Sequence, residues 1–477
     1  MTDQPLLPTA AELGTLYRQR KVAPSEIARQ HLARIEQLDP VLHAMQYVDV
    51  ERALAAAQES DGRWTQGRPR GPLDGVPMTI KDNVDMAGLP TRHGSRTSPE
   101  TPASIDSPVV ARLREAGAVI LGKTRLPEFG WTGLAASPLH NDPVRNPWNI
   151  AASPGGSSGG AAACVAAGIG AIAFGNDGGG SIRVPASFCG LCGLKPTFGR
   201  VPHHPQEGVF ATLVAGGPIT HTVADAVTAL AVMAKPDDRD WFALPAPPAD
   251  WLTDMHPRLG DLRIAYAPVL GGIAADDAVR TVVDNAIERL REAGATIIEV
   301  ASPIAPLKER FEAYWIAGFA SRLRTIPRAR WDEVDPGFRA LAERGLAVET
   351  QTLLDGEAAR AALGREFAAF HRDYDLLLTP TVPHVAPPVE TIYHSPNYDR
   401  WRDGVPFTLP FNLTGQPALT MPCGLARSGL PVGLQIAGPR YSERSVLECG
   451  LAIEVALDCR GHRRASETVI AQLKASL

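Results

Sequence analysis

The sequence is short of the features that would assign it to several large classes of protein. Only 6 of its 477 residues are cysteine, too few for a disulfide scaffold, and neither a second Cys-x-x-Cys nor a zinc-spaced His pair accompanies Cys189-x-x-Cys192. No apolar run reaches the ~18 residues of a membrane span. The formal net charge of -5 disfavours nucleic-acid binding. We therefore expect no metal, no cofactor, no membrane contact and no nucleic acid.

Other familiar motifs are missing or lie in the wrong place. The start, Met1-Thr2-Asp3-Gln4, lacks the basic residues and apolar core of a signal peptide, which predicts a cytoplasmic, reducing location. A redox Cys-x-x-Cys opens a helix after a strand, whereas Cys189 and Cys192 lie in an apolar, glycine-rich stretch, so we expect buried structural thiols. There is no P-loop. The G-x-G-x-x-A match at 168–173 follows a helical pattern and enters a strand, the reverse of a dinucleotide site.

What the chain does contain is a concentration of glycine and serine between residues 153 and 195. Gly155–Gly160 reads G-G-S-S-G-G, Asp177–Ser181 reads D-G-G-G-S, and an alanine-rich apolar run separates the two. Glycine is entropically costly, so such clusters indicate positive φ or a close approach of the backbone to another group. Glycines beside a serine also leave backbone N–H groups free to point at one spot, as in an oxyanion hole. Two linked turns of this kind favour a functional site over plain turns.

A third candidate is Lys81, which follows the predicted strand Val76–Ile80. The chain has 7 lysines among its 47 basic residues, so a lysine at this position suggests a task that arginine cannot perform. Lysine loses its proton when it is desolvated, whereas arginine effectively does not. On position alone, a lysine that reaches solvent or pairs with Asp82 or Asp85 is equally compatible.

The hydrophobic pattern predicts alternating helices and strands of an α/β protein. We expect one domain, residues 1–477, whose four parts are a helical lead-in (1–60), a core that carries the candidate site (61–300), a helical substrate-cap region (301–375), and C-terminal strands with a closing helix (376–477). In the cap region, Phe311, Tyr314, Trp315 and Phe319 either face a substrate or form an ordinary core between helices. The sequence leaves both open.

One competing motif involves the first serine turn. Gly155–Gly159 matches G-x-S-x-G, the nucleophile elbow, which needs an apolar strand directly before it and an Asp and a His downstream. Residues 148–154 make a poor strand, although acids and His384 do lie downstream. In this alternative Ser157 would be the nucleophile.

The joint pattern is far more specific than any of its parts. Lys81 in G-V-P-x-x-x-K-D, Ser157 in P-G-G-S-S-G-G and Ser181 in D-G-G-G-S-I-R closely resemble the amidase signature family of serine hydrolases. The resemblance continues through 188–197, 217–220 and 411–439 and spans nearly the whole chain. It implies one α/β/α domain around a large, mixed, twisted sheet.

The resemblance also implies a Ser-cisSer-Lys triad, and the chemistry of the residues agrees with it. A serine hydroxyl needs a base, and no histidine lies near either serine in the sequence. In this hypothesis neutral Lys81 takes a proton from Ser157, Ser157 takes one from Ser181, and Ser181 attacks an amide carbonyl. The expected oxyanion donors are the backbone N–H groups of Gly178, Gly179, Gly180 and Ser181.

Neighbouring residues are expected to support this site. Asp177 and Arg183 should pair as scaffolding, and Ser158 should be a turn residue bonded to the backbone. Asn176 occupies the position where the family often has threonine. We expect this difference to change the local hydrogen bonding and the shape of the acyl pocket. We expect the pocket to be lined from four segments: 127–137, 200–215, 306–330 and 383–408.

Two functions compete within the family. Its amidotransferase subunits usually carry a D-Q-x-G-P-like stretch, where this chain has Val214-Ala215-Gly216-Gly217-Pro218. That difference favours a stand-alone amidase acting on a small aryl or alkyl carboxamide over the glutaminase subunit of a tRNA-dependent amidotransferase complex. The expected partner is then a small-molecule amide, and a homodimer is left open.

Overall fold

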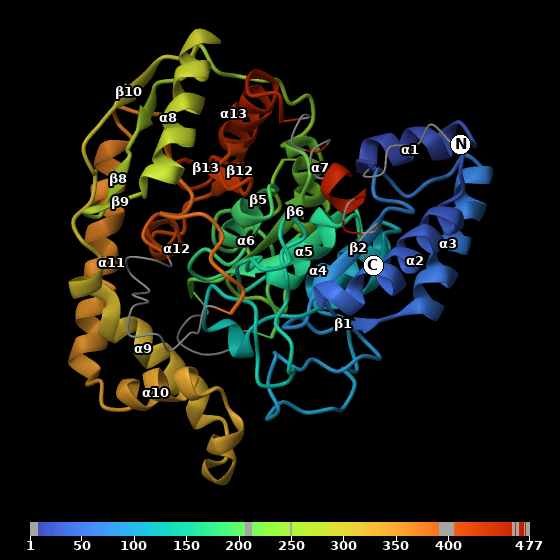
Figure 1. The fold of residues 1–477 in the computed structure, drawn as a ribbon, viewed down its shortest axis with the longest axis horizontal. Coiled ribbons are helices and arrows are strands. Elements are labelled where there is room, and N and C mark those ends of the chain that lie inside the picture. The colour runs from blue at the N-terminus through green and yellow to red at the C-terminus, as the bar shows by residue number, and fades with distance from the viewer. Residues whose placement is uncertain are drawn as a thin grey trace.

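A single mixed sheet runs through the described part of the chain (Figure 1). The computed structural model describes residues 8–205, 212–248, 250–390, 405–459, 463, 467–471 and 473. The sheet has 11 strands, in the spatial order β1 (Met45–Val48), β3 (Val119–Thr124), β2 (Pro77–Lys81), β4 (Ile172–Asp177), β6 (Ala215–Thr220), β5 (Cys192–Lys195), β12 (Ala418–Leu425), β13 (Pro431–Ala437), β11 (Leu376–Pro380), β7 (Ile264–Tyr266) and β10 (Ile297–Glu299). A separate hairpin pairs β8 (Val269–Leu270) with β9 (Ile273–Ala274).

The strand directions make the sheet mixed, as predicted. Strands β2, β3 and β4 are parallel to one another, and so are β7, β10 and β11. The strands between these two groups pair antiparallel. Parallel strands are usually buried on both faces and read as continuous apolar runs. In β4, Ile172 and Phe174 enter the core on one face while Ala173 enters it on the other.

Helices cover both faces, which confirms the predicted α/β class. One face packs against α4 (Pro108–Glu115), α7 (Val223–Met233), α8 (Asp277–Glu292) and α13 (Glu443–Ala456). The other packs against α2 (Pro24–Leu42), α3 (Val50–Thr65), α5 (Gly159–Ala166) and α6 (Arg183–Phe188). Two short helices, α1 (Ala10–Arg18) and α12 (Leu409–Leu413), complete these layers. Because α5 is built almost entirely from glycine and alanine, it can pack closely against the sheet beside the predicted site.

The region 301–375 is helical, as expected. It contains α9 (Lys308–Arg324), the 3₁₀ helix η3 (Arg328–Glu333), α10 (Pro336–Gly345) and α11 (Thr350–Phe370), drawn in gold and orange at the left of Figure 1. The aromatic residues of α9 divide between the two roles that the sequence left open. Phe311 and Tyr314 are buried in a hydrophobic cluster with α11, whereas Trp315 and Phe319 line a cavity.

Two sequence-based expectations need adjustment. The lead-in 1–60 holds the expected helices but also supplies strand β1, which pairs antiparallel with β3 at the sheet edge. Strands β5 and β6 and helix α6 were not predicted from the sequence.

Among the residues with described positions, none of the helices combines the length and hydrophobicity that crossing a bilayer requires. The described cysteines, Cys189 and Cys192 included, are buried free thiols, as predicted.

Candidate active site

The sheet topology explains why distant parts of the sequence meet. Lys81 is the last residue of β2, and the turn Gly178–Ser181 follows β4 directly. Strands β2 and β4 are parallel neighbours, with Ile80 paired to Phe174. Since the carboxyl ends of parallel strands share one edge of a sheet, Lys81 and the second serine turn lie at the same edge.

Lys81 contacts the first serine turn directly. Its Nζ donates a hydrogen bond of 2.7 Å to Ser157 Oγ, and both side chains are buried. Burial lowers the pKa of Lys81 from 10.5 to about 7, although the negative charge of Asp177 acts in the opposite direction. A substantial fraction of Lys81 side chains is therefore neutral at physiological pH. The side chain is 1% exposed, so the alternative that it reaches solvent is wrong.

Ser157 lies in a turn between residue 152 and α5. The Gly156–Ser157 peptide bond is cis, in agreement with the resemblance. Gly130, which has a φ of +68°, passes so close that a Cβ there would stand 3.0 Å from Ser157 Oγ. Ser158 bonds to backbone as expected, because its N–H donates to Ser181 O and its Oγ donates to Asn176 O.

The second serine turn rests on a buried ion pair. Arg183 Nε and Nη2 donate to the two carboxylate oxygens of Asp177, each at 2.9 Å, and neither side chain is exposed. Burial alone would raise the pKa of Asp177, but the charge and hydrogen bonds of Arg183 hold it well below its usual range. Arg183 also donates to Thr408 O, Gln435 Oε1 and Asn412 Oδ1. The predicted scaffolding pair is therefore confirmed.

The backbone of this turn offers fewer free donors than the sequence suggested. Gly180 N–H donates to Asp177 Oδ1 at 2.7 Å, so it is committed to the scaffold, and its place among the expected oxyanion donors is corrected. Within the described residues, the N–H groups of Gly178, Gly179 and Ser181 have no protein acceptor. Gly180 is needed for its conformation: its φ is +130°, and a Cβ there would lie 2.4 Å from Thr408 Oγ1.

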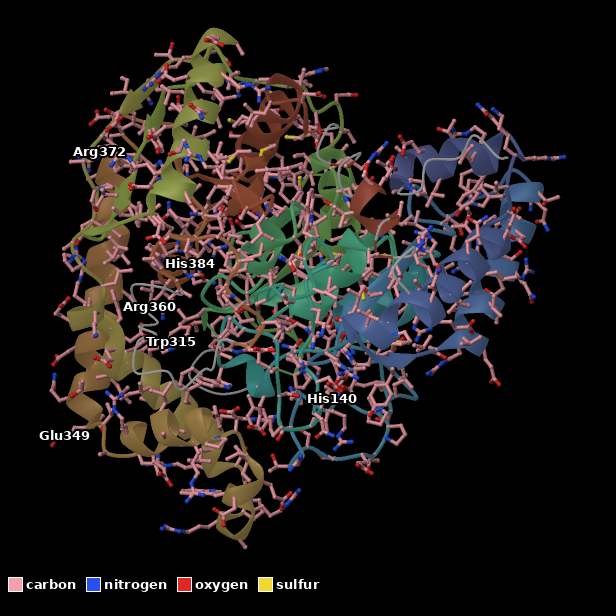
Figure 2. All side chains as sticks on the ribbon, in the orientation of Figure 1. His140, Trp315, Glu349, Arg360, Arg372 and His384 are labelled. Carbon is pink, nitrogen blue, oxygen red and sulfur yellow. The ribbon has the colours of Figure 1, made fainter. Side chains whose placement is uncertain are left out.

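All the predicted site residues line one cavity of about 1050 Å³: Lys81, Ser157, Gly178, Gly179, Gly180 and Ser181. Each of the four expected pocket segments contributes to its wall, through Phe129, Trp131, His203, Val214, Trp315, Phe319 and Val405 among others. In Figure 2, Trp315 lies on the inward side of the cap helices, whereas Glu349 lies at their outer edge. Trp315 and Phe319 of α9 thus line the same cavity as Ser157 and Ser181.

The sequence did not reveal one whole wall of the cavity. Residues 97–99 and 101–105, together with Asn83, Asp85, Thr91 and His93, line it from the irregular segment between β2 and α4. Burial lowers the pKa of His93 to about 3, so this imidazole is neutral and a poor base. The length of the non-periodic segment directly after Lys81 was the available signal.

The nucleophile-elbow alternative lacks its structural context. No strand directly precedes Gly155 in the described residues, since residues 146–152 form turns. His384 does not line the cavity; its ring packs 5.8 Å from that of Phe188. The described residues also contain no cluster of three His, Cys, Asp or Glu side chains able to hold a metal ion.

Comparisons with known proteins find relatives along nearly the whole chain. The Amidase family model matches residues 26–447. An acylamidase of Rhodococcus erythropolis is 33% identical over 486 residues, covering 99% of this chain and 100% of that protein. A glutamyl-tRNA(Gln) amidotransferase subunit of Acidothermus cellulolyticus is 36% identical over 492 residues, covering 97% and 96%.

Solved structures give the same result. A bacterial aryl acylamidase of the amidase signature family matches with a TM-score of 0.87 and 27% identity, covering 96% of this chain and 98% of that one. A 6-aminohexanoate cyclic dimer hydrolase bound to its substrate matches with a TM-score of 0.86 and 26% identity, covering 96% and 98%. The chain therefore belongs to the amidase signature family of hydrolases.

Proposed function

We propose that this protein is a stand-alone amidase that hydrolyses the C–N bond of a small carboxamide through an acyl-enzyme on Ser181. The observation that carries the proposal is the 2.7 Å hydrogen bond between buried Lys81 and Ser157, in a cavity that Ser181 also lines. A serine needs a base to become a nucleophile, and a desolvated lysine can supply one.

The reaction begins with a proton relay. Neutral Lys81 takes the proton of Ser157 Oγ as Ser157 takes that of Ser181, and Ser181 Oγ attacks the carbonyl carbon. The carbonyl electrons move to oxygen, where the N–H groups of Gly178, Gly179 and Ser181 donate to the developing oxyanion. When the C–N bond breaks, the relay returns its proton to the leaving amine. Water then attacks the ester by the same relay, which releases the acid and restores Ser181.

The cavity wall favours an apolar, aromatic amide. Its cap side carries the rings of Trp315, Phe319 and Phe338, and the facing loop adds Phe129 and Trp131. Aromatic rings contribute large apolar contact areas and pack well against other rings. The resemblance to the aryl acylamidase and to the Rhodococcus acylamidase supports the same choice.

The glutaminase subunit of an amidotransferase is the second candidate, because several curated relatives are such subunits at 33–36% identity. In this chain Val214 lines the cavity beside Gly178, where those subunits usually carry a polar Asp-Gln pair. Activity on glutamine that appears only with added partner subunits would support the second candidate. A cytoplasmic location and a possible homodimer stay predictions from the sequence.

The proposal is tested by labelling the purified protein with a fluorophosphonate and mapping the adduct by mass spectrometry. We expect the phosphonyl group on Ser181, no adduct in Ser181→Ala, and amide hydrolysis by the protein alone. Ser158→Ala is the matched control, since Ser158 bonds to backbone and should leave Ser181 reactive. An adduct on Ser157 would instead make that residue the nucleophile and contradict the relay.

A further inference from the structure

Beside the oxyanion turn, the cavity wall contains a polar pair that the relay does not use. Asn176 is the residue before Asp177 on β4, and His203 comes from the loop after β5; both line the cavity. Asn176 Nδ2 lies 3.4 Å from His203 Nδ1. The two residues are 27 positions apart in the sequence and meet only because of the fold.

Asn176 is not explained by packing alone. Its side chain is 3% exposed, and its Oδ1 is buried without a hydrogen-bond partner among the described residues. A buried polar atom without a partner is costly, so it needs a compensating role. Among the described residues, the contact between its Nδ2 and His203 Nδ1 is the only side-chain hydrogen bond of this amide.

The contact determines which nitrogen of His203 is free. Burial lowers the pKa of His203, so the ring is neutral and carries one proton. If Asn176 Nδ2 donates to Nδ1, that proton lies on Nε2. A different contact fixes the backbone of His203: its N–H donates a hydrogen bond of 2.9 Å to Asp240 Oδ2. Among the described residues Nε2 has no hydrogen-bond partner, and its ring lines the cavity.

We propose that His203, oriented by Asn176, is a specificity-determining residue whose Nε2–H donates a hydrogen bond to an acceptor atom of the substrate. This proposal rests on the proposed amidase function and narrows its substrate class. The aromatic cap favours an apolar ring, and the Asn176–His203 pair adds a requirement for an ether, carbonyl or similar acceptor elsewhere in the amide. A purely hydrocarbon amide would leave the imidazole N–H unpaired inside the cavity, which costs binding energy.

The test uses two pairs of amides that differ only in one ether oxygen. On the acyl side, methoxyacetyl anilide is compared with butyryl anilide. On the amine side, the butyryl amide of para-methoxyaniline is compared with that of para-ethylaniline. For each pair, the ratio of kcat/KM for the ether to kcat/KM for the hydrocarbon is measured in wild type and variants. His203→Phe keeps a ring of similar shape but removes both nitrogens.

We expect His203→Phe to lower this ratio in one of the two pairs by about threefold to tenfold, the worth of one neutral hydrogen bond. Asn176→Leu should lower the same ratio, because it frees the imidazole to change its protonated nitrogen. His204→Phe, next in the chain but not part of the cavity wall, should leave both ratios as in wild type. Fluorophosphonate labelling of Ser181 in each variant shows whether the catalytic turn is intact.

Two outcomes would overturn the proposal. One is an unchanged ratio in both pairs for a His203→Phe protein that still labels at Ser181. The other is a ratio that rises in that variant, which would mean that Nε2 accepts rather than donates. Failure of the amidase proposal looks different, because wild type itself would then hydrolyse none of the four amides.

Discussion

The rate of acylation should depend on pH through the protonation state of Lys81. Burial brings the pKa of this lysine from 10.5 to about 7, and only the neutral amine can accept the proton of Ser157. The sign follows directly: lowering the pH below about 7 protonates the base and removes activity, whereas raising it above about 7 gives a plateau. An unperturbed lysine would let activity climb up to about pH 10.

The size of the effect can be worked out from this pKa. One pH unit below the pKa, about one-tenth of the lysines are neutral, so kcat/KM should fall about tenfold for each further unit. Lys81→Arg should remove the base at every accessible pH, because guanidinium does not lose its proton. The expected loss is about a hundredfold to ten-thousandfold in kcat/KM, the usual contribution of a general base.

The assay measures the second-order rate constant of fluorophosphonate labelling between pH 5 and 10. The value of kcat/KM for an anilide is measured over the same pH range. Among the other buried groups with a pKa near 7, Lys195 and Glu128 need controls. Burial lowers the pKa of Lys195 to about 7 and raises that of Glu128 to about 7. Lys195→Gln keeps a donor for Pro196 O, and Glu128→Gln keeps an acceptor for Ser95 Oγ. Both should retain the midpoint near 7.

A midpoint near 10, a profile without pH dependence, or full activity in Lys81→Arg would refute the role of Lys81 as the base. A midpoint near 7 that disappears in Lys195→Gln would assign the titration to that lysine, which lies on β5 and donates to the backbone carbonyls of Pro196 and Gln416.

Two further predictions concern stability. Arg183→Met should lower the free energy of unfolding by about 3–5 kcal/mol in denaturant titrations, because it leaves the buried charge of Asp177 without its partner; an effect below 1 kcal/mol would contradict this prediction. Burial raises the pKa of Asp225 on α7 to about 7, so the folded state binds a proton that the unfolded state releases, and stability should fall as pH rises from about 4 to 7. Asp225→Asn keeps an acceptor for Ala10 N–H and should reduce that decline in urea midpoints measured at pH 5 and 8; an unchanged decline would argue against it.

The parts of the site that the sequence predicted are those encoded by short local patterns. Lys81 lies at the end of one apolar strand and the glycine-rich turn follows another, and the resemblance to the amidase signature family predicted that they meet. In the structure, the parallel pairing of β2 with β4 brings them to one edge of the sheet. The antiparallel strands in the middle of the sheet were harder to foresee. Strand β6 contains two adjacent glycines and a proline, Gly216-Gly217-Pro218, residues that are usually depleted in strands. Its place is determined by pairing with β4.

The cavity wall was less accessible to sequence reasoning because it is made of irregular segments. Residues 97–105 have no helical or strand period, and their position depends on contacts far away in the sequence. Glu128 shows the kind of contact involved: its carboxylate accepts from Ser95 Oγ on one side and from the N–H of Asp335, at the start of α10, on the other. The buried side chain of Glu128 thus links the loop that contains Ser95 to the start of α10 at Asp335, although these two residues are 240 positions apart in the sequence.

Gly180 was predicted as an oxyanion donor, and the hydrogen bonds of the turn explain why its N–H group is not free. The sequence-based prediction treated every backbone N–H group of the turn as a free donor, but some of these groups form hydrogen bonds that hold the turn in place. Gly180 N–H is bonded to Asp177, Gly179 O accepts from Thr408 Oγ1, and Ser181 O accepts from Ser158 N–H. Within the described part of the chain, three backbone N–H groups of the turn, those of Gly178, Gly179 and Ser181, have no protein acceptor. Because the carbonyls of Gly179 and Ser181 already accept hydrogen bonds from Thr408 and Ser158, the turn is left with N–H donors, as the proposed oxyanion hole requires.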